Sequence, residues 1–99
     1  MAGKYPEEGL ASWYSSKTTS TGEGFSDDYF SCAMRRVDFG KCYQVCNMEN
    51  NKCVVVRHND FGPAKNYFKR GRIIDLTKTA FSQIASLEEG LVKVKVNEY

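Results

Sequence analysis

The stretch CYQVCNMENNKCVVVRHND, residues 42–60, decides the fold because it predicts a β-hairpin closed by a disulfide. Two runs rich in β-forming residues flank MENNK, a polar turn whose adjacent asparagines tolerate positive φ. Cys46 and Cys53 stand on the two arms of this hairpin, a few residues either side of the turn, where their Cβ atoms can come within disulfide reach. The stretch therefore predicts a bridge between Cys46 and Cys53.

The other two cysteines, Cys32 and Cys42, are then predicted to pair with each other by elimination. Four cysteines in 99 residues favour two disulfides and an oxidising compartment. Zinc is the alternative, but the cysteine spacings of ten, four and seven lack the paired CxxC units of common zinc sites, and the chain has a single histidine. We therefore predict disulfides, no metal site and no cofactor.

Length and charge restrict the class of protein. A chain of 99 residues with 41% hydrophobic and 26% charged residues fits one folded domain, residues 1–99, with residues 1–8 as a flexible N-terminus. The net charge of +2 is too small to imply nucleic acid. The sequence contains no run of 18 apolar residues, the length needed to span a membrane. We predict a monomer.

The cysteines also predict a location. An oxidising environment implies a secreted or periplasmic protein, yet no signal peptide is visible in MAGKYPEEGL. This start is either a mature terminus with an added Met or a chain that has lost its signal. Four free thiols in a reducing cytosol are the other possibility.

The rest of the chain predicts a small β-barrel with one helix. GLASWYSS (9–16) and RIID (72–75) predict strands, and LEEGLVKVKVNEY (87–99) predicts a turn and a half-buried strand. YFSCAM (29–34) is another apolar segment, and the polar residues 15–28 before it predict a surface loop. LTKTAFSQIAS predicts a helix of about ten residues with Thr77 as its N-cap.

Four segments occur in the order of a known pattern: GLASWYS, VVVRHNDFGP, GRIIDLTKTAFSQI and EEGLVKVKV. They resemble the barwin-like, double-psi β-barrel domain of the rare lipoprotein A family, whose pattern runs ASWY, V-R-x-N-D-x-G-P, R-I-I-D-L-S, a helix A-x-x-x-I and a strand G-x-x-x-V. KCYQVC is similar to a run in the first domain of expansins. The resemblance spans nearly the whole chain and implies a mainly β, six-stranded double-psi β-barrel with one or two short helices and a shallow glycan groove.

The resemblance implies a wall-associated function. In the rare lipoprotein A family the domain cleaves peptidoglycan as a lytic transglycosylase, whereas expansins bind and loosen wall polysaccharide without measurable hydrolysis. We therefore expect a secreted protein that binds peptidoglycan or a related wall polysaccharide, with catalysis open. One alternative is a lytic transglycosylase that uses Asp60 as general acid and base, and another is a non-enzymatic interaction or inhibitor module.

Two aspartates carry the predicted chemistry. Asp60 falls on the Asp of N-D-x-G-P, which the resemblance marks as a catalytic acid, and Asp75 falls on the Asp of R-I-I-D-L-S. Glycosidic cleavage needs a protonated carboxyl beside the leaving oxygen, and a second carboxylate can tune it. We predict that both carboxyls face one open groove within about 10 Å of each other. The alternative is that Asp60 caps a turn and Asp75 lies at the start of a helix.

One family residue is missing. The lytic members carry T-A-A-H where this chain has SCAM, so Met34 stands in place of a histidine. Methionine cannot shuttle a proton, which predicts binding with little or no turnover. Restoring the histidine by Met34→His would then raise any trace activity.

Several further residues are predicted to bind glycan because hydroxyls, amides and aromatic rings suit sugars. On an ideal strand, His58 would face the same side as Asp60, although a hydrogen-bonded barrel histidine is the alternative. Trp13 is expected in the core. For Phe61, Tyr67 and Phe68, the alternative to stacking on glycan is that they pack as a lid over the barrel. The basic run Lys65, Lys69, Arg70 and Arg72 is a solvated face or meets anionic wall polymers. The predicted glycan-binding set is Ser12, Tyr14, His58, Asn59, Phe61 and Tyr67.

Overall fold

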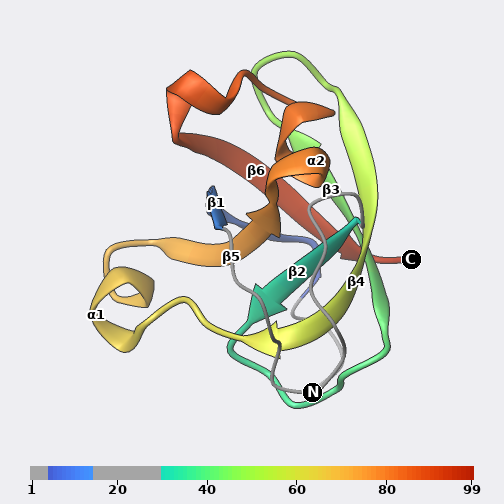
Figure 1. Cartoon of the computed structure of the whole chain (residues 1–99), viewed down its shortest axis with the longest axis vertical. Coiled ribbons are helices and arrows are strands. Elements are labelled where there is room, and N and C mark those ends of the chain that lie inside the picture. Colours follow the sequence, from blue (N-terminus) through green and yellow to red (C-terminus); the bar gives the residue numbers. More distant parts are fainter. Residues whose placement is uncertain (1–4, 15–29) are drawn as a thin grey trace.

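The computed structural model describes residues 5–14 and 30–99, and these form a closed six-stranded barrel (Figure 1). The two short α-helices are α1 (Lys65–Phe68) and α2 (Lys78–Ser82), and a 3-10 turn, η1, spans Leu87–Glu89. This architecture confirms the predicted mainly β barrel with short helices. The strands are β1 (Glu7–Tyr14), β2 (Ser31–Met34), β3 (Cys42–Asn47), β4 (Cys53–Phe61), β5 (Arg72–Thr77) and β6 (Leu91–Glu98).

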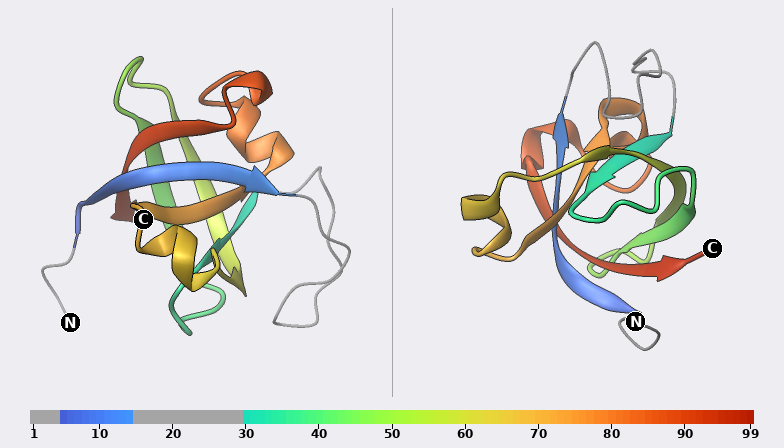
Figure 2. Two further views of the ribbon diagram at one scale, coloured as in Figure 1. Left: turned by 90° about the vertical axis from the view of Figure 1, so that its left-hand side faces the viewer. Right: turned by 90° about the horizontal axis from the view of Figure 1, so that it is seen from below.

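The strand order around the barrel is β1-β5-β2-β4-β3-β6. Two neighbouring pairs, β1 with β5 and β2 with β4, are parallel, and the other pairs are antiparallel. Each parallel pair joins strands that are not consecutive in the sequence. Strand β5, for example, lies between β1 and β2 (Figure 2). Strand β1 includes residues 7 and 8, which corrects the prediction that the flexible terminus extends to residue 8.

The central hairpin confirms the strongest prediction from the sequence. Strands β3 and β4 pair antiparallel with Cys46 directly opposite Cys53, and these two cysteines form a disulfide with a Cα–Cα distance of 4.0 Å. Asn51 in the turn has a φ of 62°, the left-handed conformation that asparagine tolerates. The disulfide therefore links directly opposed residues of the two hairpin strands.

The predicted bridge between Cys32 and Cys42 is wrong, because both cysteines are free. Cys32 pairs with His58 on one side of β4, and Cys42 pairs with Arg57 on its other side, so the backbones are about two strand spacings, or roughly 10 Å, apart. A disulfide needs Cα atoms within about 7 Å. The Cys32 side chain is also buried in the core, whereas Cys42 alternates with the buried Tyr43 on the outward face of β3.

Alkylation tests this disulfide pattern. We expect the denatured, unreduced protein to take up label at two thiols, Cys32 and Cys42, and at four after reduction. In the folded protein Cys32 should react slowly, because burial raises the pKa of its thiol well above the usual value. Intact-mass measurement of the labelled protein gives the count. Failure of the denatured, unreduced chain to react would show that a second disulfide does form.

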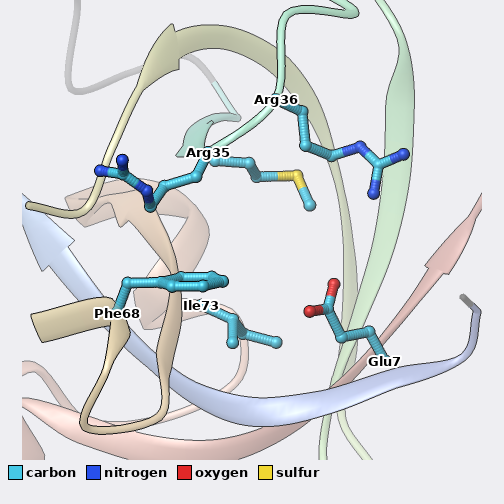
Figure 3. A pocket seen from close by; sticks show the side chains of 6 residues that line it. Glu7, Arg35, Arg36, Phe68 and Ile73 are labelled. Atoms are coloured by element: carbon cyan, nitrogen blue, oxygen red, sulfur yellow. The ribbon is translucent and has the colours of Figure 1, made fainter. Parts of the chain in front are cut away.

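Helix α1 lies beside the barrel and buries none of its residues (Figures 1 and 2). The sequence predicted no helix here, and this one is only one turn long. A small pocket separates α1 from the strands at this end of the barrel, with Arg35 and Phe68 on one side and Glu7 and Arg36 opposite (Figure 3). Met34 and Ile73 complete its lining. The pocket thus lies between α1 and this end of the barrel.

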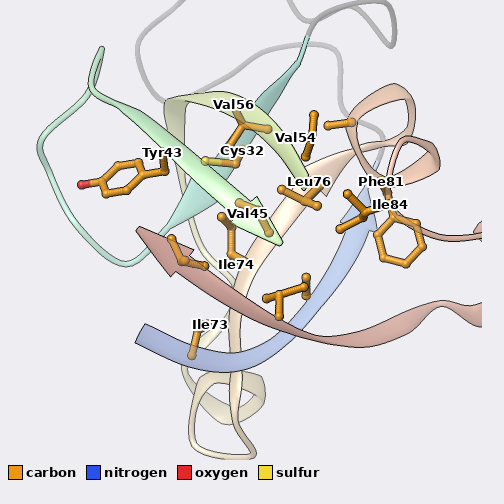
Figure 4. Packing of buried hydrophobic residues seen from close by; sticks show 14 of the residues in the cluster. Cys32, Tyr43, Val45, Val54, Val56, Ile73, Ile74, Leu76, Phe81 and Ile84 are labelled. Carbon is orange, nitrogen blue, oxygen red and sulfur yellow. The ribbon is translucent and has the colours of Figure 1, made fainter. Parts of the chain in front are cut away.

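The core fills the barrel and extends under α2 (Figure 4). Thr77 caps α2, since its Oγ1 accepts a hydrogen bond from the amide of Ala80, as the sequence predicted. The helix ends at Ser82, earlier than predicted, but Phe81 and Ile84 are both fully buried. Trp13 packs against this cluster, as expected. The buried apolar residues include Ala11, Cys32, Met34, Tyr43, Val45, Val54, Val56, Ile74, Leu76, Val92, Val94 and Val96.

Gly9 allows β1 to approach β5 closely. A Cβ atom on Gly9 would lie 2.8 Å from Cγ2 of Ile73 and 2.9 Å from the carbonyl oxygen of Gly71. We expect Gly9→Ala to lower the free energy of unfolding by about 1–3 kcal/mol, because the strands must separate to admit the methyl group. Chemical denaturation measures the change, with Glu8→Ala, an exposed position on the same strand, as the control. Equal stability of the two variants would contradict this packing.

Candidate functional site

Four adjacent strands align the two predicted aspartates in one row. Ser12 pairs with Asp75, Asp75 pairs with Ala33, and Ala33 pairs with Asp60. Paired residues on neighbouring strands point to the same face of a sheet. Ala33 alternates with the core residues Cys32 and Met34, so this common face is the outer one. We call Ser12, Asp75, Ala33 and Asp60 the carboxylate row.

The register fixes the separation of the two aspartates. Their backbones flank β2 on opposite sides and are therefore about two strand spacings, or roughly 10 Å, apart. That separation is compatible with two carboxyl groups that serve one glycan. Shared placement on one face agrees with the prediction, but Asp75 is only 8% exposed and does not lie open as predicted.

Asp75 is held by two donors. Its Oδ1 accepts hydrogen bonds from Ser12 Oγ at 2.5 Å and from Arg72 Nε at 3.0 Å. Its Oδ2 lies close to the backbone of Gly62, where an added Cβ would be 3.8 Å away. Ser12 and Arg72 therefore fix the carboxylate on the barrel wall, and the hydrogen bonds of Asp75 serve the row rather than the start of α2.

Asp60 is the more accessible of the two aspartates, being only half-buried. Its Oδ1 accepts a hydrogen bond from the amide of Phe61 at 2.8 Å, so the predicted turn-capping contact is present. The same residue also belongs to the row, and the two roles are compatible because a carboxylate has two oxygens. Asp60 is thus the row carboxylate better placed to meet a ligand.

Tyr14 lies near both aspartates. Burial raises the pKa of its phenol well above the usual value, and the charges of Asp60 and Asp75 raise it further. The hydroxyl is therefore protonated at neutral pH and can donate a hydrogen bond. The hydroxyl oxygen itself is buried, so the partly exposed ring of Tyr14, beyond Ser12 on β1, is the part that can contact a ligand at this end of the row.

His58 lies on the opposite face from Asp60, which corrects the prediction that it shares the groove. A β-bulge places Asn59 as an extra residue in β4, because Cys32 pairs with His58 while Ala33 pairs with Asp60. His58 is fully buried. Its Nδ1 is 2.7 Å from Oδ1 of Asp38, and its Nε2 is 2.9 Å from the carbonyl oxygen of Asp60. A glycan on the outer face cannot reach this ring.

The sequence did not predict the partner of His58. Asp38, in the segment between β2 and β3, also accepts a hydrogen bond from the Tyr43 hydroxyl. Partial burial alone would raise the pKa of Asp38, but hydrogen bonds from Tyr43 and His58, with the charges of His58 and Arg36, lower it. Asp38, Tyr43 and His58 form a partly buried network directly behind Asp60.

The other predicted glycan residues differ in position. Asn59, in the bulge, is 5% exposed, and its Oδ1 has no hydrogen-bond partner among the described residues. Phe61 and Tyr67 are exposed and lie beyond the row, at the end of β4 and on α1. Met34 faces the barrel interior and is 2% exposed, so a histidine there would not lie beside Asp60. The expected gain of activity from Met34→His therefore has no support in this geometry.

A second bulge, in β5, brings Arg72 to Asp75. Leu10 pairs with Arg72 while Ala11 pairs with Ile74, so one extra residue intervenes. This extra residue places Arg72 and Asp75 on the same face although they are three positions apart. The row can therefore offer a half-buried carboxyl and a fixed carboxylate, which suit sugar hydroxyls and acid–base chemistry. Among the described residues, no cluster of histidine, cysteine and acidic side chains could hold a metal ion.

A closed barrel with two parallel strand pairs and a shared outer row of aspartates defines a double-psi β-barrel protein. Residues 6–96 match the family described as "Lytic transglycolase", and the chain belongs to that family. The aspartate motifs that suggested the resemblance are the ones that build the row. In the described part of the chain, no helix is both long and apolar enough to cross a membrane.

Curated relatives support the family. The chain is 38% identical over 93 residues to the "Endolytic peptidoglycan transglycosylase RlpA" of Campylobacter jejuni, covering 90% of this chain and 32% of the relative. It is 36% identical over 95 residues to a "Probable endolytic peptidoglycan transglycosylase RlpA" of Nostoc, covering 90% and 24%. The "Endolytic peptidoglycan transglycosylase RlpA" of Rickettsia felis is 33% identical over 99 residues, covering 93% and 42%. The chain thus spans less than half the length of each of these relatives.

Two solved structures share the fold. The Streptomyces papain inhibitor superposes with a TM-score of 0.70 at 19% identity, covering 91% of this chain and 94% of the inhibitor. A mutant of the Clavibacter michiganensis expansin in complex with cellohexaose superposes with a TM-score of 0.64 at 15% identity, covering 93% and 49%. At these identities the likeness shows the barrel fold alone.

Proposed function

We propose that this protein is a secreted or periplasmic wall protein that binds peptidoglycan or a related wall polysaccharide along the carboxylate row. The observation that carries the proposal is the alignment of Asp60, Ala33, Asp75 and Ser12 across four adjacent strands. Asp60 and Tyr14 supply direct contacts, while Asp75 acts mainly by fixing Ser12 and Arg72. The whole of residues 1–99 is proposed to act as one domain.

Lytic transglycosylation is a second candidate function for the same site. It is favoured by the likeness to relatives named as endolytic peptidoglycan transglycosylases and by the half-buried Asp60 carboxyl. In such a reaction Asp60 would donate a proton to the leaving glycosidic oxygen, the C–O bond would break, and Asp60 would then take the proton from the sugar's own O6 as the anhydro bond forms. No histidine faces the row among the described residues, so we propose that turnover is slow compared with binding.

Co-sedimentation with insoluble glycans tests the proposed function. Wild type is mixed with purified peptidoglycan sacculi and with cellulose, and the soluble products are analysed by chromatography and mass spectrometry for 1,6-anhydro ends. We expect retention on sacculi with little or no anhydro product. Robust product that disappears in Asp60→Asn would establish the lytic alternative. Absence of binding to every glycan would overturn the proposal and favour an interaction module instead.

A further inference from the structure

Helix α1 carries a basic and aromatic surface that borders the carboxylate row. Lys65, Lys69 and Arg70 are exposed, and none of them has an ion-pair partner among the described residues. Tyr67 and Phe68 are 44% and 39% exposed on the same helix. Together with residues of the neighbouring strands they make up what we call the α1 surface, which comprises Arg35, Phe61, Lys65, Tyr67, Phe68, Lys69, Arg70 and Arg72.

Two arginines in this surface are held in place by aromatic rings and oxygen atoms. The Arg35 guanidinium lies 5.0 Å from the centre of the Phe61 ring and 5.8 Å from that of Phe68, and its Nη1 donates to the carbonyl oxygen of Pro63 at 3.1 Å. Figure 3 shows Arg35 and Phe68 together on one side of the pocket at the barrel end. Such contacts restrain an arginine before any ligand arrives, which lowers the entropic cost of binding.

Arg72 connects the α1 surface to the row. Its guanidinium lies 4.6 Å from the centre of the Tyr67 ring, while its Nε donates to Asp75. Phe61 makes a second connection, because it follows Asp60 on β4 and lies under Arg35. A chain bound along the row could therefore continue onto α1 without crossing another element.

The chemistry of this surface suits an acidic polymer with sugar rings. Guanidinium and ammonium groups bind carboxylates, and exposed aromatic rings stack on the apolar faces of sugars. Asp75 offsets the charge of Arg72, and Glu7 lies across the pocket from Arg35, but the three cations in and directly after α1 are not offset in this way. A neutral glucan would leave those cations without partners.

We propose that the α1 surface is a subsite for the carboxylates of peptidoglycan, so that the protein prefers peptidoglycan to neutral wall glucans. The inference rests on the proposed function, because it extends the same bound chain beyond Asp60 and Asp75. It predicts that affinity depends on the carboxylates of the polymer and on the charge of α1. The row contributes the part of the affinity that does not depend on polymer charge.

The test compares binding to native sacculi with binding to sacculi whose carboxyl groups have been amidated. We expect wild type to bind native sacculi about tenfold more tightly, and Lys69→Glu/Arg70→Glu to lose that advantage while binding amidated sacculi like wild type. The matched control is Lys52→Glu/Lys93→Glu, which changes the net charge equally at exposed positions near the β3–β4 hairpin. This control should bind both polymers like wild type.

The possible results separate the two proposals. Equal wild-type affinity for native and amidated sacculi would overturn the subsite and leave glycan binding at the row intact. If the control lost as much affinity for native sacculi as Lys69→Glu/Arg70→Glu, the subsite would also be overturned. Net charge, rather than the α1 surface, would then be responsible for the affinity. If wild type bound neither polymer, the proposed function and the subsite would both fail.

Discussion

Replacing Asp38 with alanine is expected to lower the free energy of unfolding by about 2–4 kcal/mol, because it leaves two buried polar groups, the His58 ring and the Tyr43 hydroxyl, without their partner. His58 is fully buried and its Nδ1 is 2.7 Å from Asp38. The Tyr43 hydroxyl would lose its acceptor in the same variant. Chemical denaturation with fluorescence or circular dichroism measures the change. Glu49→Ala removes an exposed acid from the hairpin turn and serves as the control, with almost no expected loss.

The loss of unfolding free energy in Asp38→Ala should depend on pH in a defined direction. The pKa of Asp38 is lower in the folded protein than in the unfolded chain, whose aspartates titrate near about pH 4. The stabilisation from its ionised form is therefore complete above the unfolded pKa and is lost as the pH falls through the folded pKa. The stability gap between wild type and Asp38→Ala should narrow below about pH 4. A gap that widened on acidification would contradict the assignment.

Exchanging Asp60 for asparagine is expected to lower the rate of any 1,6-anhydro product release by about 10²–10⁴, the usual contribution of one positioned acid–base group. Stability should hardly change, because the asparagine carbonyl oxygen can still accept the hydrogen bond from the Phe61 amide. Long incubations with sacculi and chromatographic detection are needed to follow slow turnover. Thermal unfolding in parallel separates a lost proton donor from a damaged fold.

Asp75→Asn is the informative comparison, since Asp75 holds its neighbours through charge-assisted contacts. Arg72 and Ser12 both donate to Oδ1 of Asp75, so the amide weakens these contacts and should lower stability as well as binding. We therefore expect Asp60→Asn to lower turnover without a loss of stability, and Asp75→Asn to lower both stability and binding. Identical behaviour of the two variants would show that the two aspartates do not have separate roles.

Alternation and turn chemistry were enough to predict much of the fold. The hairpin, the Cys46–Cys53 disulfide and the Thr77 cap depend on short segments, so local patterns identify them. The motif resemblance supplied the barrel and the two aspartates of the row. Motifs identify the barrel and these two aspartates without knowledge of the strand register.

The remaining features depend on register, which the sequence pattern does not show. One extra residue in β4 puts His58 and Asp60 on opposite faces, although ideal alternation predicts the same face. Another in β5 brings Arg72 to Asp75. Pairing by elimination failed for Cys32 and Cys42 because they flank β4 from opposite sides. Asp38 was missed since only the fold brings it to His58.

The most direct measurement of the proposed binding site is an NMR titration of isotope-labelled protein with soluble peptidoglycan chains. We predict that the amide signals of Ala33, Asp60 and Phe61 shift first, together with those of Asp75 and its β5 neighbours. Signals of α1 should follow if the chain extends along it. Shifts confined to the turn between β3 and β4 (residues 48–52) and to β6, or no shifts at saturating glycan, would contradict binding at the carboxylate row.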